Sequence, residues 1–312
     1  MRYIGASSST RRRSRASPKP VARRNSSVVG QPSSEREKWS SMRSLREINV
    51  MEYETIDFEV TDSVATITLD RPDNANTLNK KMVEELFAVS IKCSTNKSIR
   101  SVILTGRGKL FCGGADLAVL SEMDGHGEAQ ILELATILHA AITRFSQMDA
   151  PLVVAVNGAA GGGGFSLALA GDYVIASDKA KFVSAYTASG LTPDGSSTYF
   201  LAKHVGLLRA KELAMTNRVL SPDEAQDWGL VNKVVPADEL ASEARKMAGV
   251  FATGPTKAFG GLKRLLQTAF SDTMETQLDK ESVSVAAMMR THDTPHAIAS
   301  FLNKEKPNFK GE

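Results

Sequence analysis

Residues 152–172 read L-V-V-A-V-N-G-A-A-G-G-G-G-F-S-L-A-L-A-G-D, and this segment decides the fold. Its first five residues are all apolar, which predicts a strand buried on both faces. The glycine run 161–164 follows, and the apolar spacing beyond it predicts a helix from about Phe165. A buried strand that passes through glycines into a helix is typical of a strand–helix crossover. We therefore expect an α/β fold in which helices pack on a parallel sheet.

The segments on either side continue this alternation of strands and helices. Alternating apolar residues predict a hairpin of strands 55–60 and 64–69 around the turn Asp62-Ser63. The other elements expected up to residue 183 are helices over 79–93 and 129–148 and short strands over 101–105, 173–176 and 182–183. After Thr198 the pattern is mainly helical, and we expect no strand in the last third of the chain.

The composition is that of a globular protein. The chain has 312 residues, of which 42% are hydrophobic and 23% charged, enough for one large domain or two small ones. No stretch approaches the roughly 18 apolar residues of a membrane helix, so we expect no membrane association. The two cysteines, Cys93 and Cys112, suggest neither a disulfide framework nor a zinc site, which favours a reducing compartment.

The basic character of the chain belongs to its first residues. Residues 1–34 hold eight of the 38 Arg and Lys residues and none of the 35 acidic ones, so the remainder carries a formal charge of −5. We therefore expect no nucleic-acid surface. Residues 1–50 predict a disordered basic tail, which is either an over-long start before Met51 or a mitochondrial transit peptide. The corresponding locations are the cytoplasm for a bacterial protein and the mitochondrial matrix for a eukaryotic one.

Two glycine-rich loops, each of which enters a helix, indicate an anion-binding function. Residues 161–164 allow a ligand to approach the backbone, and the start of the following helix offers free N–H groups. Residues 110–117, L-F-C-G-G-A-D-L, have the same character. Two N–H donors on two loops are what an oxyanion hole requires. The alternative for the glycines is close packing of a helix against a strand.

These loops identify the chain as resembling a known family. The segments F-C-G-G-A-D-L and V-N-G-A-A-G-G-G-G-F-S-L-A-L-A-G-D are similar to the two signature loops of the crotonase (enoyl-CoA hydratase/isomerase) superfamily. The similarity continues through 179–182, 190–194, 229–231 and 301–304 and covers roughly residues 53–309. It implies a spiral of strand–strand–helix (ββα) units over residues 51–250 and a helical trimerisation region over 251–312. It also implies an acyl-CoA substrate, no permanently bound cofactor, and a homotrimer or homohexamer.

The resemblance also implies roles for individual residues of the two loops. The backbone N–H groups of Ala115 and Gly163 would form the oxyanion hole that stabilises an enolate. Asp116 and Leu117 would lie beside the adenine and pantetheine of the coenzyme. The remaining glycines expected at the coenzyme are Gly113, Gly114 and Gly162.

Two positions depart from the pattern of the hydratases in this family. Hydratases use two glutamates to add water, and the matching residues here are Ser166 and Tyr186. A serine and a tyrosine, whose phenol has an ordinary pKa of about 10, do not readily replace two carboxylates near neutral pH. We therefore expect poor hydration, with Tyr186 remaining a residue of the catalytic site.

Asp194 is a carboxylate that the resemblance places in the catalytic site. Its surroundings, P-D-G-S-S-T-Y-F-L, are most similar to the epoxyphenylacetyl-CoA isomerases, which with other isomerases of the family carry an acidic residue there. Isomerisation of a 3-enoyl thioester needs a single base, so we expect an enoyl-CoA isomerase with Asp194 as its proton shuttle. We expect Asp194 to be buried among Leu191, Pro193 and Tyr199. The alternative is that Asp194 starts a turn or caps a helix from Ser196.

His139 supports a rival chemistry. His139 lies twelve residues before Pro151, and Tyr186 lies eight residues before Asp194. This spacing resembles that of the 4-chlorobenzoyl-CoA dehalogenases, where an aspartate attacks the ring and a histidine activates water, although Tyr186 stands where those enzymes have tryptophan. The alternative is a histidine packed in the core. A weak hydratase and a catalytically silent CoA-binding scaffold are further alternatives.

The remaining candidates show no pattern of a site. The other histidines have no ligand spacing, so we expect no metal. Lys304 and Lys306 are either contacts for a coenzyme phosphate or part of a solvated tail.

Overall fold

The computed structural model describes residues 53–123 and 127–312. The interpretation of residues 1–50 as a disordered tail lies outside the described residues. The described residues belong to one compact unit. The sequence predicts a boundary between the core and the C-terminal helical region at residues 250 and 251. Helix α8 (Leu240–Ala252) spans that point, and the boundary stays a prediction.

A six-stranded sheet forms the centre of this unit. Its order is β1-β2-β3-β4-β6-β8, and only β1 and β2 are antiparallel. The strands are β1 (Ile56–Thr61), β2 (Val64–Leu69), β3 (Ser101–Gly106), β4 (Leu152–Val156), β6 (Tyr173–Ser177) and β8 (Lys233–Val235). A second, parallel pair consists of β5 (Ala159–Gly161) and β7 (Lys181–Val183). The parallel sheet predicted from the alternating strands and helices is therefore confirmed.

The first hairpin follows directly from its turn residues. Asp62 and Ser63 both have left-handed backbone conformations, with φ of 52° and 63°. A two-residue turn of this kind matches the twist of the strands on either side. Thr61 consequently pairs with Val64, as the alternation of apolar residues predicts.

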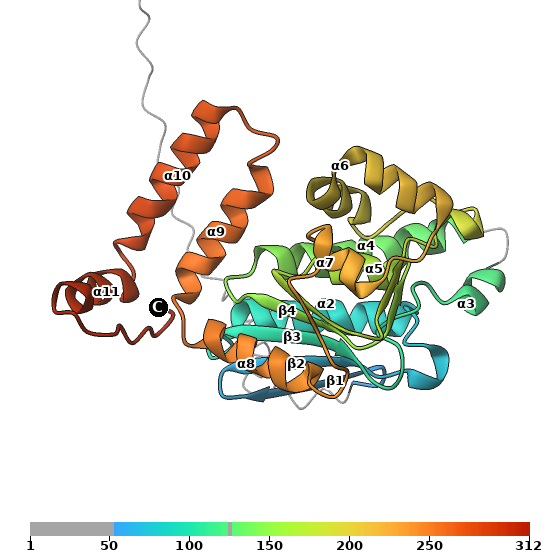
Figure 1. Cartoon of the computed structure of the whole chain (residues 1–312), viewed down its shortest axis with the longest axis horizontal. Coiled ribbons are helices and arrows are strands. Elements are labelled where there is room, and N and C mark those ends of the chain that lie inside the picture. The colour runs from blue at the N-terminus through green and yellow to red at the C-terminus, as the bar shows by residue number, and fades with distance from the viewer. Residues whose placement is uncertain (1–52, 124–126) are drawn as a thin grey trace, which may run out of the picture. The chain divides into compact units, whose positions relative to one another are not determined.

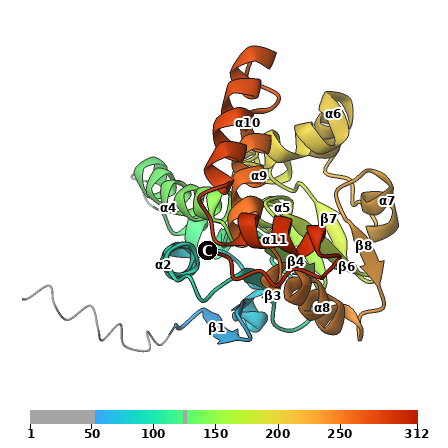
Figure 2. The same ribbon diagram turned by 90° about the vertical axis from the view of Figure 1, so that its left-hand side faces the viewer.

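Helices cover both faces of the sheet. On one face, α8 lies against the sheet (Figures 1 and 2). Its Leu240, Ala244 and Ala248 pack there with buried residues of β3, β4 and β6. The other face carries the larger core, made with α2 (Lys80–Thr95), α4 (Gly127–Gln147) and α5 (Gly163–Leu169). The remaining helices are α3 (Leu117–Ser121), α6 (Ser197–Thr216), α7 (Pro222–Asp227), α9 (Thr256–Thr268), α10 (Met274–Met288) and α11 (Asp293–Leu302).

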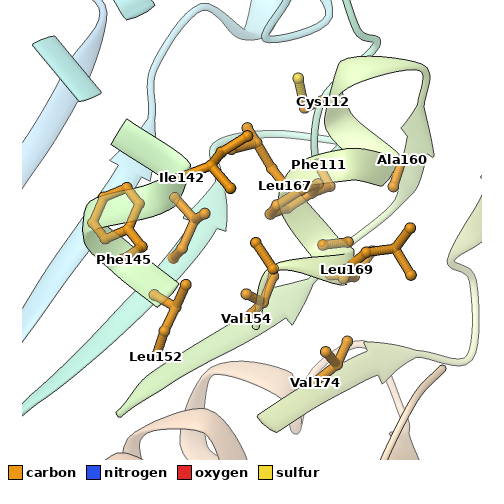
Figure 3. Packing of buried hydrophobic residues seen from close by; sticks show 14 of the residues in the cluster. Phe111, Cys112, Ile142, Phe145, Leu152, Val154, Ala160, Leu167, Leu169 and Val174 are labelled. Carbon is orange, nitrogen blue, oxygen red and sulfur yellow. The ribbon is translucent and has the colours of Figure 1, made fainter. Parts of the chain in front are cut away.

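The larger core lies directly beneath the glycine-rich loops. Figure 3 shows it between β4 and helices α4 and α5, where its labelled members include Ile142, Phe145, Leu152, Val154 and Leu167. Phe111 and Cys112, from the first glycine-rich loop, belong to the same fully buried cluster. The loops are therefore anchored in the most tightly buried part of the molecule.

The expectation of no strand after Thr198 was wrong. Strand β8 comprises Lys233–Val235, and it pairs with β6 at the edge of the sheet. The strand has three residues, K-V-V, of which only Val235 is buried. So short an apolar run does not predict a strand. No described helix has the length and apolar composition to cross a membrane.

Helices α9 and α10 lie side by side and project from the sheet layers (Figures 1 and 2). Helix α9 is fastened to these layers by Lys263, whose buried Nζ lies 2.6 Å from Oδ2 of Asp172. The same Nζ donates to the carbonyl oxygens of Phe145 and Ala150 at 2.9 and 3.2 Å. Burial lowers the pKa of Lys263 and raises that of Asp172, so each group needs the other to remain charged.

We predict that Lys263→Met lowers the free energy of unfolding by about 1–3 kcal/mol, because the carbonyl oxygens of Phe145 and Ala150 lose their buried charged donor and Asp172 loses its counter-charge. Urea unfolding followed by circular dichroism measures the change. Lys257→Met is a matched control on the same helix, since the Lys257 side chain, which pairs with Asp149 at 2.7 Å, is 41% exposed and that of Lys263 is 8% exposed. The control should cost less than about 1 kcal/mol. Similar losses in the two variants would contradict the prediction.

Candidate active site

Two glycine-rich loops meet backbone against backbone. Cys112 and Ala160 form an isolated parallel bridge, in which the N–H of Cys112 donates to the Ala159 oxygen at 3.2 Å. The N–H of Gly161 donates in turn to the Cys112 oxygen at 2.9 Å. Short strand β5, which the sequence did not predict, is therefore what holds the second loop against the first.

The glycines make this approach possible. A Cβ atom on Gly164 would lie 2.2 Å from the Cys112 oxygen, and one on Gly114 would lie 2.8 Å from the Gly161 oxygen. Gly114 also has a φ of 98°, which other residues rarely adopt. The glycines therefore allow close packing, but of one loop against the other and not of a helix against a strand as the alternative had it. Helix α5 begins at Gly163, two residues before the expected Phe165.

Each loop presents a backbone N–H without an acceptor. In the described part of the chain, the N–H groups of Ala115 and Gly163 donate to no oxygen. Their neighbours are engaged, since Asp116 N–H donates to Leu78 and Gly162 N–H donates to Val183, both at 3.1 Å. Gly163 opens α5, where the first N–H groups have no partner within the helix. The two free donors thus come from adjoining loops.

The carboxylate of Asp116 is already engaged within the first loop. Its Oδ2 lies 3.0 Å from the Arg71 guanidinium and accepts from the Thr77 hydroxyl at 3.2 Å. Burial alone would raise the pKa of Asp116, but the hydrogen bonds from Arg71 and Thr77 outweigh it and hold the pKa below its ordinary value. Leu117, by contrast, is exposed at the start of α3.

Two buried or half-buried asparagines support the first loop. Asn76 is fully buried, and its amide donates to the carbonyl oxygens of Arg107 and Leu110, both at 2.9 Å. Asn157 also donates to Leu110, at 3.3 Å. Sequence reasoning missed both residues, although the asparagines within R-P-D-N-A-N-T-L at 71–78 are a signal of a structured turn.

Asp194 lies beside these loops, held through its own carbonyl group. The Asp194 carbonyl oxygen accepts from the Ser166 hydroxyl at 2.7 Å and from the Tyr186 hydroxyl at 3.1 Å. The two hydroxyls are 2.9 Å apart, and Ser166 belongs to α5, one turn after Gly163. Burial raises the pKa of Tyr186 to about 12, against the effect of its hydrogen bond with Ser166. Tyr186 is therefore a protonated donor at neutral pH.

The carboxylate of Asp194 pairs with His139. Nε2 of His139, on α4, lies 2.6 Å from Asp194 Oδ1, and the Gly195 N–H lies 3.3 Å from the same nitrogen. The His139 side chain is 48% exposed, so the interpretation of His139 as a packed core residue was wrong. The structure brings together two residues 55 positions apart in the sequence.

The expected burial of Asp194 was also wrong. Its side chain is 37% exposed, and Leu191 and Tyr199 are themselves exposed. The alternative in which Asp194 starts a turn holds, because the Ser197 N–H donates to the Asp194 carbonyl oxygen at 3.2 Å. The helix-cap alternative fails, because α6 begins at Ser197 and no N–H of its first turn donates to the Asp194 carboxylate. The Asp194 carboxylate bonds to His139, and its Oδ2 has no hydrogen-bond partner among residues 53–123 and 127–312.

The other candidate residues lie outside this cluster or have no reactive group available. Cys112 is buried, and burial raises the pKa of its thiol to about 12. Lys304 and Lys306 are exposed near the C-terminus. Within the described ranges, no three His, Cys, Asp or Glu side chains gather as metal ligands.

A model of the protein family described as Enoyl-CoA hydratase/isomerase matches residues 59–312. The chain belongs to this family, the crotonase superfamily. The resemblance and the fold class predicted from the two loops are confirmed, and the protein is an acyl-CoA enzyme of this family.

Known relatives include proteins with different reactions. The chain is 36% identical to 1,2-epoxyphenylacetyl-CoA isomerase of Escherichia coli, over 81% of this chain and 97% of the relative. It is 32% identical to 4-chlorobenzoyl coenzyme A dehalogenase-2 of Arthrobacter sp, over 80% and 91% of the two chains. The crystal structure of enoyl-CoA hydratase from Bacillus anthracis superposes with a TM-score of 0.78 at 32% identity, over 83% of this chain and 100% of that one. Membership of the crotonase family alone therefore does not select a reaction.

The Asp116 ion pair gives a prediction about pH. Because the pKa of Asp116 is lower in the folded protein than its ordinary value of about 3.9, its stabilising contribution is complete above that value and is lost as the pH falls through the folded-state pKa. Asp116→Asn should therefore lower the free energy of unfolding by about 1–3 kcal/mol at pH 7. The difference from the unsubstituted protein should shrink below about pH 4.

Denaturant unfolding at several pH values measures this dependence. Asp70→Asn is the control, because Asp70 makes a more exposed ion pair with Arg107 at 2.7 Å. The control should change stability by less than about 1 kcal/mol. An Asp116→Asn deficit that is constant from pH 7 to pH 3 would contradict the prediction.

Proposed function

We propose that the protein is an enoyl-CoA isomerase that shifts a double bond through an enolate. Asp194 carries protons, and the N–H groups of Ala115 and Gly163 bind the thioester oxygen. The observation that supports this most is the hydrogen bonding of the Asp194 carboxylate. Its Oδ1 is held by His139, while Oδ2 has no partner in the described part of the chain. One free carboxylate oxygen beside two free N–H donors is sufficient for this reaction.

The two N–H groups suit a developing negative charge. They come from the backbone of adjoining loops, so they need not reorganise when an enolate oxygen forms. Gly163 also begins α5, and a helix start favours a negative group. The loops are anchored in the core through Phe111 and Cys112, which keeps the donors in place.

A single carboxylate is enough to move the double bond. In the proposed reaction, Asp194 Oδ2 takes a proton from C2 of a 3-enoyl thioester, and the electrons pass into a dienolate on the thioester oxygen. The same carboxyl group then returns the proton to C4. Ser166 and Tyr186 do not replace a hydratase carboxylate pair, because the pKa of Tyr186 is about 12 and the Ser166 hydroxyl is buried. This supports isomerisation over hydration.

His139 sets the direction of the carboxylate in this proposal. When Asp194 is ionised, the His139 Nε2–H donates to Oδ1 and leaves Oδ2 for the substrate. Because Nε2 then carries a proton, it does not accept a hydrogen bond from the Gly195 N–H at the same time. His139 therefore affects which oxygen reacts.

The coenzyme would lie against the first loop through its backbone and Leu117. The Asp116 carboxylate holds Arg71 and Thr77, so its contribution is to fix the loop. Gly113, Gly114 and Gly162 likewise shape the loops, since Gly113 N–H donates to Ala75 and Gly162 N–H donates to Val183.

The proposal includes self-association as a homotrimer or homohexamer. Apolar side chains are exposed along α9 and α10 and the turn between them, among them Leu266, Phe270, Met274 and Val285. Exposed apolar surface of this extent is typical of a protein interface. Sedimentation of the purified protein measures its mass, and a monomer would count against this part of the proposal.

We predict that Asp194→Asn keeps acyl-CoA affinity within a few fold and lowers the isomerisation rate by roughly 10²–10⁴, because Asn does not accept the C2 proton. It should also abolish exchange of the C2 proton with deuterated solvent. Steady-state kinetics and mass spectrometry of the acyl-CoA measure the two effects. Asp57→Asn, on β1, is the control and should behave like the unsubstituted protein. Exchange near the normal rate in a folded Asp194→Asn protein would remove Asp194 from the mechanism.

The His139–Asp194 contact supports a second candidate, hydrolytic dehalogenation of an aryl-CoA. Asp194 Oδ2 would attack the chlorinated ring carbon, and chloride would leave to give an aryl ester of Asp194. A water deprotonated by His139 would then hydrolyse this ester and regenerate the carboxylate. The half-exposed ring of His139 is compatible with contact to such a water.

His139→Gln distinguishes the two candidates. If the protein is an isomerase, we predict that the variant retains proton exchange at C2 within about tenfold, and that neither protein releases chloride from 4-chlorobenzoyl-CoA. Chloride release by the unsubstituted protein, with an aryl adduct on Asp194 that accumulates in the variant, would instead establish the second candidate. Ion chromatography and intact-protein mass spectrometry measure these outcomes.

A further inference from the structure

The peptide group between Asp194 and Gly195 is held through its carbonyl oxygen. This oxygen accepts from the Ser166 and Tyr186 hydroxyls at 2.7 and 3.1 Å and from the Ser197 N–H at 3.2 Å. The Gly195 N–H lies 3.3 Å from Nε2 of His139 and donates to it only when that nitrogen carries no proton. The orientation of this peptide plane fixes the direction in which the Asp194 side chain leaves the backbone.

The backbone here needs such restraint. Gly195 and Ser196 both have left-handed conformations, with φ of 61° and 65°. For Ser196, which carries a Cβ, this conformation costs free energy. A Cβ on Gly195 would lie 2.9 Å from the Cβ of Ser166, so the loop is pressed directly onto α5. Contacts with Ser166 and Tyr186, together with the hydrogen bond from the Ser197 N–H to the Asp194 carbonyl oxygen at 3.2 Å, hold the loop in this conformation.

We infer that Ser166 and Tyr186 are positioning residues, which orient the Asp194 carboxylate by binding the carbonyl oxygen of the same residue. The inference rests on the proposed function of Asp194. The two hydroxyls are therefore neither the base nor the acid of the reaction, because they act on the substrate only through Asp194.

The geometry excludes direct chemistry by Ser166. Its side chain is 0% exposed, and its hydroxyl contacts Asp194, Tyr186 and the Gly162 oxygen, the last at 3.3 Å. Each hydroxyl has one proton, and the shortest of these contacts directs that of Ser166 to Asp194. The Tyr186 proton then points to Ser166 or to Asp194, so it too is used within the cluster.

The same contacts tie the carboxylate to the thioester site. Ser166 lies on α5, whose first residue is Gly163, so the hydrogen bond from Ser166 joins the base to the helix that carries an N–H donor. A base misplaced by about 1 Å loses on the order of 100-fold in rate. Removal of the hydroxyls should therefore slow proton transfer without weakening substrate binding.

The test compares Tyr186→Phe and Ser166→Ala in the full-length protein. We expect each to lower kcat for isomerisation by about 10- to 100-fold with KM within about threefold. The double variant should lose less than the product of the two, because both hydroxyls bind one oxygen. Tyr173→Phe is the matched control, since the Tyr173 ring packs against Phe251, and it should leave kcat unchanged. If Ser166→Ala does not fold, Tyr186→Phe alone decides.

Two further measurements separate positioning from catalysis. In the Asp194→Asn background, Tyr186→Phe should cause no further loss of rate, because nothing remains to be positioned. The pH profile of kcat for Tyr186→Phe should keep the shape of the unsubstituted profile. A lost alkaline limb would show that Tyr186 transfers a proton, and an unchanged kcat in both single variants would show that the hydroxyls position nothing. Either result overturns the inference.

Failure of the proposed function has a different signature. If Asp194→Asn retains its activity, the assignment of Asp194 is wrong, and the positioning inference falls with it. If Asp194→Asn is inactive while Tyr186→Phe and Ser166→Ala have normal kcat, the function stands and the positioning inference alone fails.

Discussion

Close approach of two backbone segments is the constraint on which the rest of the site depends. Gly164 leaves no room for a side chain against the Cys112 oxygen, and Gly114 leaves none against Gly161. Because the loops meet through main-chain atoms, the hydrogen bonds at Cys112 and Gly161 fix them to each other within the core. The unpartnered N–H groups of Ala115 and Gly163 are a product of this packing. Helix α5 then extends from the same point and carries Ser166 toward Asp194.

The site divides into a main-chain part and a side-chain part. The main-chain part comprises the two loops, supported by Asn76, Asn157 and the Arg71–Asp116 ion pair. The side-chain part comprises Asp194, His139 and the two hydroxyls that hold the Asp194 peptide group. The relatives named isomerase and dehalogenase differ in the reaction their names state. In the function proposed here, the side-chain part carries the proton transfer.

Local patterns in the sequence predicted most of the fold and the two loops. The β1–β2 hairpin, the buried strand β4 and the glycine run all have signals that lie within about twenty consecutive residues. Strand β8 was missed because three residues with one buried side chain carry no such signal. Contacts between distant residues are a separate case. The family resemblance alone placed His139 and Asp194 in one site, and nothing in the sequence predicted the pairing of Arg71 with Asp116. Both contacts depend on how helices and loops meet in space, which no local spacing determines.

The family resemblance in the sequence matches Ser166 and Tyr186 to the two glutamates of the hydratases, and here both hydroxyls bind the carbonyl oxygen of Asp194. A glutamate at 166 would need the space in which the Ser166 hydroxyl now lies 2.7 Å from the Asp194 carbonyl oxygen and 2.9 Å from the Tyr186 hydroxyl. Redesign toward water addition is therefore not a matter of two substitutions. Loop 194–196 would have to be rebuilt at the same time, since the carboxylate pair and the anchored aspartate compete for the same space.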